Sequence, residues 1–283
     1  MSENIIQQTL DLCKMYNIKP QKTKGQNFLI NEEVYDKIIQ FADLQPEDTV
    51  LEVGPGLGFL TFKLAKKVKK VLAVEVDPKI VQVLDILIKS QLVKNIKIFN
   101  KDILQAKGEN FSKISPYKIV SNLPYNITSI FLRKFLSLAN KPERMILMLQ
   151  KEVVDRIIAR PPKMSLLSLS VQFYSQVEML FEVKKENFYP SPKVDSAVIK
   201  IIPNKKLLAD YQAEKNFFKL LRVAFSAKRK MLKNNLSTGF NKKVDLIEEI
   251  IRKNNLEPKI RPEQLSLDNW LDLFQSFKKE KII

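Results

Sequence analysis

The feature that most constrains the fold is an alternation of β-branched runs with amphipathic stretches between about residues 30 and 160. Five short strand-like runs follow one another: Thr49–Val53, Lys70–Glu75, Ile96–Phe99, Lys118–Ser121 and Met145–Leu149. Helical periodicity occupies the segments among and after them: Leu60–Val68, Pro78–Lys89, Ile127–Leu138 and Lys151–Ala159. Strands that alternate with helices form βαβ units with right-handed crossovers. The pattern therefore predicts an α/β fold with a largely parallel sheet that carries helices on both faces.

The predicted secondary structure changes in the last third of the chain, from alternating strands and helices to helices alone. Two more strand candidates, Val177–Val183 and Val194–Ile202, are joined by the turn-rich segment Phe188–Lys193, which is typical of an antiparallel hairpin at a sheet edge. From Asp210 onwards only helical periodicity remains. We therefore predict an α/β domain over residues 1–205, with an N-terminal helical extension, and a small all-helical domain over residues 206–283.

The amino-acid composition excludes several kinds of catalytic and metal site and favours one kind of partner. The 283 residues contain 48 Lys and Arg against 31 Asp and Glu, a formal net charge of +17, which favours a polyanionic partner. The chain has no histidine and only Cys13, so histidine-based catalysis, a disulfide within the chain and a cysteine-cluster zinc site are excluded. No signal peptide or membrane-spanning stretch is predicted, and a reducing, cytoplasmic location is expected.

Three of the six glycines stand together, directly after the first predicted strand and before a helix. Gly54, Gly56 and Gly58 suit a loop that a nucleotide-like ligand approaches closely, because glycine has no Cβ atom. The alternative is a tight strand-to-helix turn without a ligand. A dinucleotide-binding loop has the spacing G-x-G-x-x-G, and here the third glycine comes one residue early.

Acidic residues recur where consecutive strands end. Glu52 precedes the glycine loop, Glu75 lies 21 residues after Gly54 at the end of the second strand, and Asp102 follows the third strand. An acid in the position of Glu75 can hold both hydroxyls of a ribose. Each acid alone could be a solvated strand end, but three in corresponding places favour a neutral or cationic nucleoside. The sulfonium S-adenosylmethionine fits that description, whereas a pyrophosphate would be repelled.

The tetrapeptide Asn122-Leu-Pro-Tyr125 follows the fourth predicted strand, and so opens onto the same crevice as the glycine loop. An asparagine amide oxygen and a backbone carbonyl held by Pro124 provide two acceptors for the hydrogens of an exocyclic amine. Tyr125 offers a flat ring on which a base can stack. By itself such a tetrapeptide is usually only a loop, and its position is what indicates a function.

These motifs, taken in order, resemble the ribosomal RNA adenine dimethyltransferase family over about residues 20–275. The resemblance rests on six segments of the chain: Gly25–Leu29, Glu52–Gly58, Glu75–Asp77, Asn122–Ile127, Phe188–Ala197 and Phe225–Asn235. Leu123 and the segment Pro192–Ala197 are similar to the housekeeping branch, which modifies small-subunit RNA, rather than to the macrolide-resistance branch.

The resemblance implies a Rossmann-like methyltransferase sheet with a helical C-terminal domain, and S-adenosylmethionine as cofactor. It implies dimethylation of N6 on two adjacent adenosines in the 3′-terminal hairpin of small-subunit (16S) RNA, by a monomer that acts on an immature 30S particle without contacting a membrane. The implied cofactor site comprises Gln26, Asn27, Leu29, Glu52, Gly54, Gly56, Gly58, Glu75, Asp102 and Asn122. The implied catalytic set comprises Asn122, Leu123, Pro124, Tyr125 and Phe188, with Tyr125 and Phe188 enclosing the flipped adenine.

A basic stretch lies within the predicted helical domain. Residues 205–243 hold eleven Lys or Arg against two acids, Asp210 and Glu214. Within this stretch Lys228, Arg229, Lys230 and Lys233 resemble a helix face that contacts phosphates. A solvated helix is the alternative, although such crowding of like charge favours a polyanion.

Two other functions are compatible with parts of the sequence. The glycine loop alone would permit an NAD-dependent dehydrogenase, but the G-x-G-x-x-G spacing and an evident acid for hydride chemistry are missing. A non-catalytic RNA-binding or assembly factor could also retain a methyltransferase fold.

Overall fold

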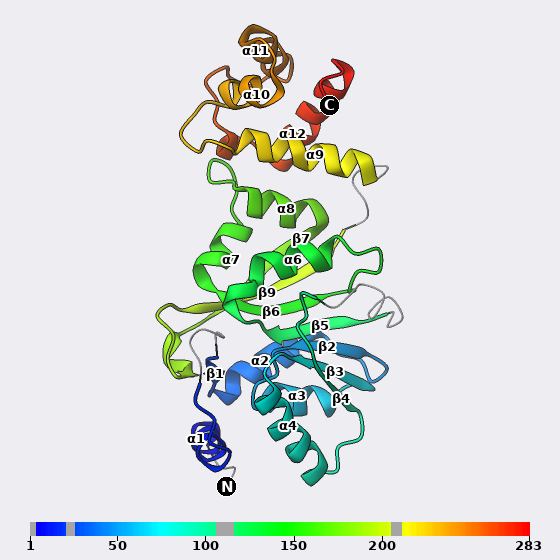
Figure 1. Ribbon diagram of the computed structural model, residues 1–283, viewed down its shortest axis with the longest axis vertical. Helices are drawn as coiled ribbons and strands as arrows, with labels where there is room; N and C mark the ends of the chain where they lie inside the picture. Colours follow the sequence, from blue (N-terminus) through cyan, green and yellow to red (C-terminus); the bar gives the residue numbers. More distant parts are fainter. Residues whose placement is uncertain (1–3, 21–25, 106–115, 205–210) are drawn as a thin grey trace. The chain divides into compact units, whose positions relative to one another are not determined.

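The computed structural model describes residues 4–20, 26–105, 116–204 and 211–283 (Figure 1). The chain divides into two compact units. An α/β unit comprises residues 1–154 and 175–203, and a helical unit comprises residues 155–174 and 204–283. The chain therefore passes into the helical unit twice.

The α/β unit contains a short two-stranded sheet and a larger mixed sheet, with helices between their strands. Its strands are β1 (Phe28–Leu29), β2 (Thr49–Val53), β3 (Lys70–Glu75), β4 (Ile96–Asn100), β5 (Lys118–Asn122), β6 (Met145–Gln150), β7 (Ser175–Val183), β8 (Phe188–Tyr189) and β9 (Ser196–Pro203). Its helices are α1 (Ile5–Met15), α2 (Glu32–Ala42), α3 (Phe59–Ala65), α4 (Pro78–Ser90), α6 (Thr128–Leu136) and the start of α7 (Lys151–Ile157).

Among the described residues, the larger sheet has seven strands in the order β4-β3-β2-β5-β6-β9-β7. The five strands from β4 to β6 are parallel, whereas β9 runs antiparallel to both β6 and β7. The predicted Rossmann-like sheet and the antiparallel strand pair at its edge are confirmed. The pairing of β1 with β8 was not predicted, because each of these strands is only two residues long.

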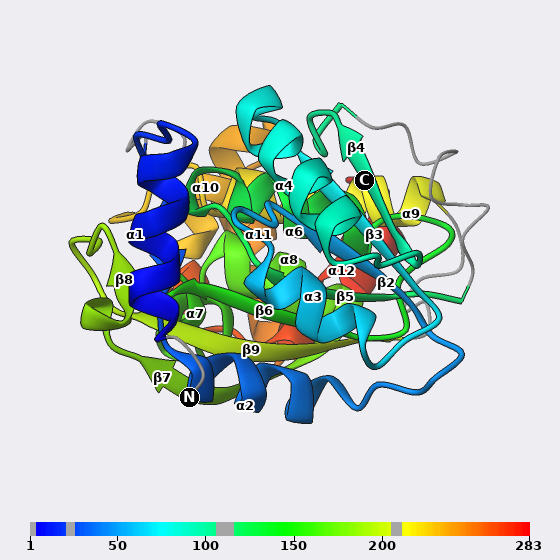
Figure 2. The ribbon, with the colours of Figure 1, turned by 90° about the horizontal axis from the view of Figure 1, so that it is seen from below.

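Local sequence signals explain where the helices begin. The Asn31 side chain accepts a hydrogen bond from Val34 N–H at the start of α2, and Asp77 accepts from Lys79 N–H at the start of α4, which has Pro78 in its first turn. Apolar side chains of α2 and α3 pack on the sheet in one buried cluster that includes Ile38 and Leu64. Figure 2 shows α2 and α3 side by side. This packing fixes the loop between β2 and α3, where the predicted ligand-binding glycines lie.

The helical unit contains the end of α7, α8 (Leu166–Tyr174), α9 (Tyr211–Ala224), α10 (Leu232–Phe240), α11 (Val244–Lys253) and α12 (Leu267–Lys279). The chain returns to this unit at Asn204, next to the boundary predicted at residue 205. However, the prediction placed residues 155–174 in the first domain, and these residues group with the C-terminal helices. The reason is aromatic packing: the Phe173 ring stacks on Phe217 of α9 at a centroid distance of 5.0 Å, and Tyr174 stacks on Phe218 at 5.6 Å.

None of the helices within the described ranges is long and apolar enough to cross a membrane.

Candidate functional site

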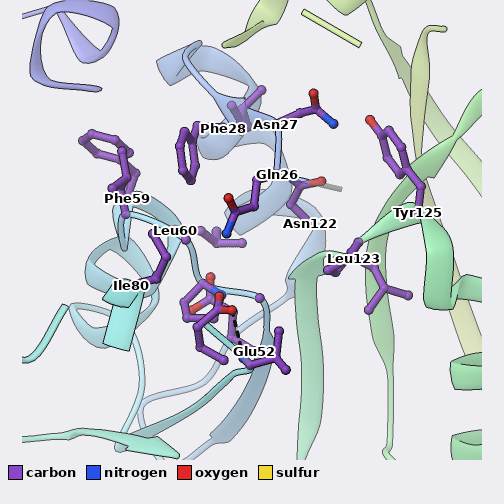
Figure 3. A pocket seen from close by; sticks show the side chains of 18 of the residues that line it. Gln26, Asn27, Phe28, Glu52, Phe59, Leu60, Ile80, Asn122, Leu123 and Tyr125 are labelled. Carbon is purple, nitrogen blue, oxygen red and sulfur yellow. Dashed lines mark hydrogen bonds between the residues drawn. The ribbon is translucent and has the colours of Figure 1, made fainter. Parts of the chain in front are cut away.

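The site lies where the order of the parallel strands reverses. Strands β2 and β5 are neighbours, but the chain runs outward from β2 to β4 before it returns to β5. In doubly wound sheets a crevice for ligands opens at the carboxyl ends of the strands at such a point. The Ser121 hydroxyl of β5 donates to the Val53 carbonyl of β2 at 2.6 Å, which holds the two strand ends together. A pocket opens there (Figure 3).

The pocket brings together most of the predicted site residues. Those that line it are Gln26, Asn27, Leu29, Glu52, Gly54, Gly56, Glu75, Asn122, Leu123, Pro124 and Tyr125. Figure 3 shows Asn122 between Gln26 and Tyr125, with Glu52 on the floor and the rings of Phe28 and Phe59 on the other side. Residues separated by almost 100 positions in the sequence therefore share one cavity.

The glycines adopt conformations that other residues rarely adopt. Gly54, Gly56 and Gly58 have φ values of +68°, +55° and +87°. A Cβ atom on Gly54 would lie 3.1 Å from Pro124 Cγ, so the glycine loop approaches the Asn122–Tyr125 turn closely. Gly58 does not line the pocket. A Cβ atom there would collide with Leu84 of α4, which indicates that this glycine serves the packing of α3 on α4.

Glu75 is held by backbone donors. Its Oε1 accepts from Val76 N–H at 2.8 Å and from Asp77 N–H at 2.9 Å, and its side chain is 8% exposed. Burial raises the pKa of Glu75, and these backbone N–H groups oppose that rise. Asp77 also accepts from the Gln26 side-chain amide at 3.1 Å, so the segment before β1 is tied to the end of β3.

Glu52 is the most deeply buried acid of the pocket. It is 2% exposed, and its Oε2 has no hydrogen-bond partner among the described residues. Burial raises the pKa of Glu52 to about 8; the side chain of Thr61 opposes this rise, and the negative charge of Glu75 adds to it. An unpartnered carboxyl oxygen in such a place fits a cationic ligand, because the charged carboxylate is costly there without a counter-charge.

Asp102 lies in an adjoining pocket. That pocket is lined by Asp102, Ile103 and Leu104, and it shares Gly54, Glu75, Val76 and Pro124 with the first. Asp102 Oδ1 accepts from Leu104 N–H at 2.8 Å, and the Lys134 ammonium of α6 donates to the Leu104 carbonyl at 2.6 Å. The three predicted acids thus line two connected compartments, with Glu75 at their junction.

The Asn122–Tyr125 turn places an amide and an aromatic ring at the edge of the first pocket. Asn122 ends β5 and is half-buried, and its side-chain amide makes no hydrogen bond to another described residue. Leu123 is fully buried, and its N–H donates to the Met148 carbonyl at 3.2 Å. The Tyr125 hydroxyl and Ser196 Oγ are 2.7 Å apart, which fixes the orientation of the ring. An unpartnered amide beside a fixed ring can accept hydrogen bonds from a planar amine.

Phe188 is not part of either pocket. It pairs with Leu29 in the β1·β8 sheet and packs in the buried core, where its side chain is 3% exposed. The strand pairing directs the Phe188 ring into the core, so in this structure the ring does not line the pocket that Tyr125 lines. The next residue, Tyr189, pairs with the pocket residue Phe28 and is 36% exposed.

Sequence reasoning missed the apolar wall of the pocket. Phe28, Leu57 and Ile80 line the pocket and also pack in a cluster with Cys13 and Ile18 of the N-terminal segment. Phe28 lies within the motif that indicated cofactor binding, whereas Leu57 and Ile80 carried no signal beyond ordinary hydrophobicity.

The predicted RNA-binding residues of the helical unit differ in their surroundings. Lys228, Arg229 and Lys230 are exposed in the turn between α9 and α10 rather than on a helix face. Lys233 is half-buried in α10, and its ammonium lies 2.6 Å from Glu248, which also binds Arg252. Its charge is therefore already neutralised within the unit.

Comparisons with known proteins show what the whole chain is similar to. Residues 17–279 match the family described as ribosomal RNA adenine dimethylase. The chain is 40% identical over 271 residues to a ribosomal RNA small subunit methyltransferase A of Dehalococcoides mccartyi, covering 95% of this chain and 92% of that protein. The corresponding protein of Bacillus cytotoxicus is 36% identical, with 97% of each chain covered. A solved dimethyladenosine transferase from Plasmodium falciparum superposes with a TM-score of 0.74 at 26% identity, covering 89% of this chain and 97% of that one.

Proposed function

The chain belongs to the ribosomal RNA adenine dimethylase family, and we propose that it dimethylates N6 of two adjacent adenosines in the 3′-terminal hairpin of small-subunit ribosomal RNA. The protein is an S-adenosylmethionine-dependent rRNA adenine dimethyltransferase. The finer proposal adds the RNA segment, the number of target nucleotides and a role in the maturation of the small subunit. It further holds that the protein acts in the cytoplasm as a monomer on an immature particle.

The observation that carries the proposal is the unpartnered Asn122 amide between the acid-lined pocket and Tyr125. We assign the hydrogens of the target amine to two acceptors, Asn122 Oδ1 and the Leu123 carbonyl. The adenine stacks on the Tyr125 ring. Extrusion of the target base into a pocket of this kind is the general way in which enzymes reach a base atom.

The two acceptors account for the chemistry. The amine lone pair of adenine is delocalised into the ring, so the nitrogen is a weak nucleophile. Hydrogen bonds to both N–H groups draw the nitrogen toward tetrahedral geometry and place acceptors where positive charge develops. Bound S-adenosylmethionine would supply the methyl group and leave as a neutral thioether, and the methylated N6, an acidic ammonium, would lose its proton to water. A chain without histidine can perform this step because no strong general base is needed.

S-adenosylmethionine supplies the methyl sulfonium when bound, and the residues of the pocket fit it. We assign the ribose hydroxyls to Glu75, the adenine amine to Asp102 and the cationic part to the region of Glu52. Gly54 and Gly56 leave room for close approach, and Gln26, Asn27 and Leu29 line the same pocket. We assign no ligand contact to Gly58, which allows α3 to pack on α4.

RNA affinity comes mainly from phosphate contacts. We assign such contacts to Lys228, Arg229 and Lys230, and not to Lys233, since Glu248 already binds it. Neutralising the first three should flatten the dependence of RNA affinity on salt and leave cofactor affinity unchanged.

The deciding experiment is single-turnover methylation of immature small ribosomal subunits with labelled S-adenosylmethionine, followed by mapping of the modified nucleotides. We expect two dimethylated adenosines next to each other in the 3′-terminal hairpin. Binding of the particle without methyl transfer would support an assembly factor instead. Modification elsewhere would refute the proposed target.

A further inference from the structure

A cluster of lysines lies at the edge of the sheet opposite the pocket. The pocket opens at the carboxyl ends of β2 and β5, whereas these lysines lie in the loops that lead into β3 and β4 or at the start of β3. All are exposed. We call them the lysine edge: Lys66, Lys67, Lys69, Lys70 and Lys94.

The loops that carry the lysine edge are held together. The Asn95 side-chain amide donates to the Ala65 carbonyl at 2.8 Å and to the Val68 carbonyl at 2.9 Å. The Asn95 carbonyl accepts from Val71 N–H at 2.9 Å. Because one side chain joins the loop before β3 to the loop before β4, the ammonium groups project from a fixed backbone, and few backbone degrees of freedom would be lost on binding.

Acids of the neighbouring loop do not neutralise the lysine edge. Asp48 pairs with Lys118 at 2.8 Å, and Asp43 pairs with Arg144 at 3.0 Å. Within the part of the chain that the structure describes, none of the five lysines makes an ion pair. The contrast is Lys63 of α3, whose ammonium lies 2.9 Å from Glu32 and 2.7 Å from Asp36. Acids therefore neutralise Lys63, whereas the lysines that follow it in residues 66–70 have no acid paired with them among the described residues.

Unopposed ammonium groups on a fixed backbone repel one another and attract a polyanion. The substrate of this enzyme is itself a polyanion. A strand of six residues such as β3 spans roughly 20 Å at about 3.3 Å per residue. An RNA segment whose phosphates contact the lysine edge is therefore a different segment from the one whose base enters the pocket.

We propose that the lysine edge binds the phosphate backbone of a second segment of the ribosomal RNA, remote from the target adenosines. The proposal rests on the proposed function, because it takes the small-subunit particle as the substrate. Such a contact selects a folded RNA that presents two segments at the correct separation, rather than the target sequence alone.

The test compares two triple variants with equal changes of net charge. One replaces Lys66, Lys69 and Lys94 with glutamine. The control replaces Lys14, Lys37 and Lys163, which are exposed but dispersed along the chain. Binding of each variant to immature small subunits is measured over a range of salt concentrations. We expect the lysine-edge variant to bind about ten-fold more weakly and its slope of log affinity against log salt to fall by about two to three, while the control keeps the wild-type slope.

Two further readouts decide what an altered affinity means. At saturating particle concentration the lysine-edge variant should methylate at the wild-type single-turnover rate, and its thermal midpoint should be unchanged. Equal slopes for the lysine-edge variant and wild type overturn the proposal, as does an equal fall in the control, which would show a net-charge effect. Binding to phosphatidylcholine–phosphatidylserine vesicles that depends on these lysines, without an effect on particle binding, would assign the surface to a membrane and also overturn it. Failure of the wild-type enzyme to methylate the particle would instead refute the proposed function.

Discussion

Two groups of polar side chains in the pocket differ in burial and in their expected ligand. We call Glu52 and Glu75 the cofactor wall, and Asn122 and Tyr125 the base wall. On the cofactor wall, Glu52 and Glu75 are 2% and 8% exposed, and burial raises the pKa of both. On the base wall, the Asn122 amide is half-buried and without a described partner. Buried acids suit the binding of a cation, whereas an unpartnered amide is preorganised for a group that arrives later. Changes on the cofactor wall should therefore alter affinity, and changes on the base wall should alter rate.

Substitution of Phe188 tests whether its ring stabilises the core or contacts the target base. Because the ring is buried in the core, Phe188→Ala should lower the free energy of unfolding by about 3–5 kcal/mol. Urea denaturation measures this loss. At a temperature where the variant is folded, its single-turnover rate should stay close to that of wild type. A folded variant with unchanged stability and a much reduced rate would show that the ring stacks on the base after all.

Asn122→Ala should reduce the single-turnover methylation rate by about 10²–10³-fold, the loss typical of removing one preorganised group that stabilises developing charge. RNA affinity should change by only a few-fold, because phosphate contacts supply most of it. Ser129→Ala, an exposed change on the following helix, is the control. A wild-type rate at saturating cofactor would contradict the acceptor mechanism.

Glu75→Ala should weaken S-adenosylmethionine binding by about 1.5–3 kcal/mol, the range for lost hydrogen bonds to a charged group. Isothermal titration calorimetry gives this value directly, and RNA affinity should remain unchanged. Glu33→Ala, at an exposed acid of α2, is the matched control. Unaltered cofactor affinity would remove Glu75 from the cofactor wall.

Glu52 should make cofactor affinity depend on pH. With a pKa of about 8 the free protein holds a proton on Glu52 at neutral pH, and a bound cation favours the carboxylate. Affinity should therefore rise from pH 6.5 to pH 8 by up to roughly 15-fold, since one proton is released and the carboxylate fraction rises from about 3% to about 50%. Glu52→Gln should abolish this rise. A pH profile that persists in the glutamine variant would point to another group.

The same pKa predicts the opposite trend for stability. The folded-state pKa lies above the ordinary value of 4.5, so folding holds an extra proton between these limits. The stability of the cofactor-free protein should be highest below pH 4.5 as far as Glu52 contributes, and that contribution should be lost as pH rises through about 8. Thermal midpoints of the wild type and Glu52→Gln across this range measure the difference.

The parallel sheet could be predicted because each strand from β2 to β6 is a compact apolar run of its own. The pocket could be predicted where its lining needs unusual residues, as at Gly54, Gly56 and Asn122. The apolar wall could not, since Leu57 and Ile80 differ in no way from core residues until the fold brings them to the pocket. The burial of Phe188 could not be predicted, because it depends on pairing with Leu29, a contact between two-residue strands that leaves no periodic pattern.

The helical unit is built from two separate stretches of the chain, and this has a consequence for synthesis. Helix α8 leaves the ribosome before α9 and α12 exist, so the rings of Phe173 and Tyr174 remain without their partners until more than forty further residues have been made. During this interval strands β7 and β9 can already join the sheet. The helical unit thus closes last, and truncation of the chain after β9 would leave α8 with an exposed aromatic face rather than release an intact smaller enzyme.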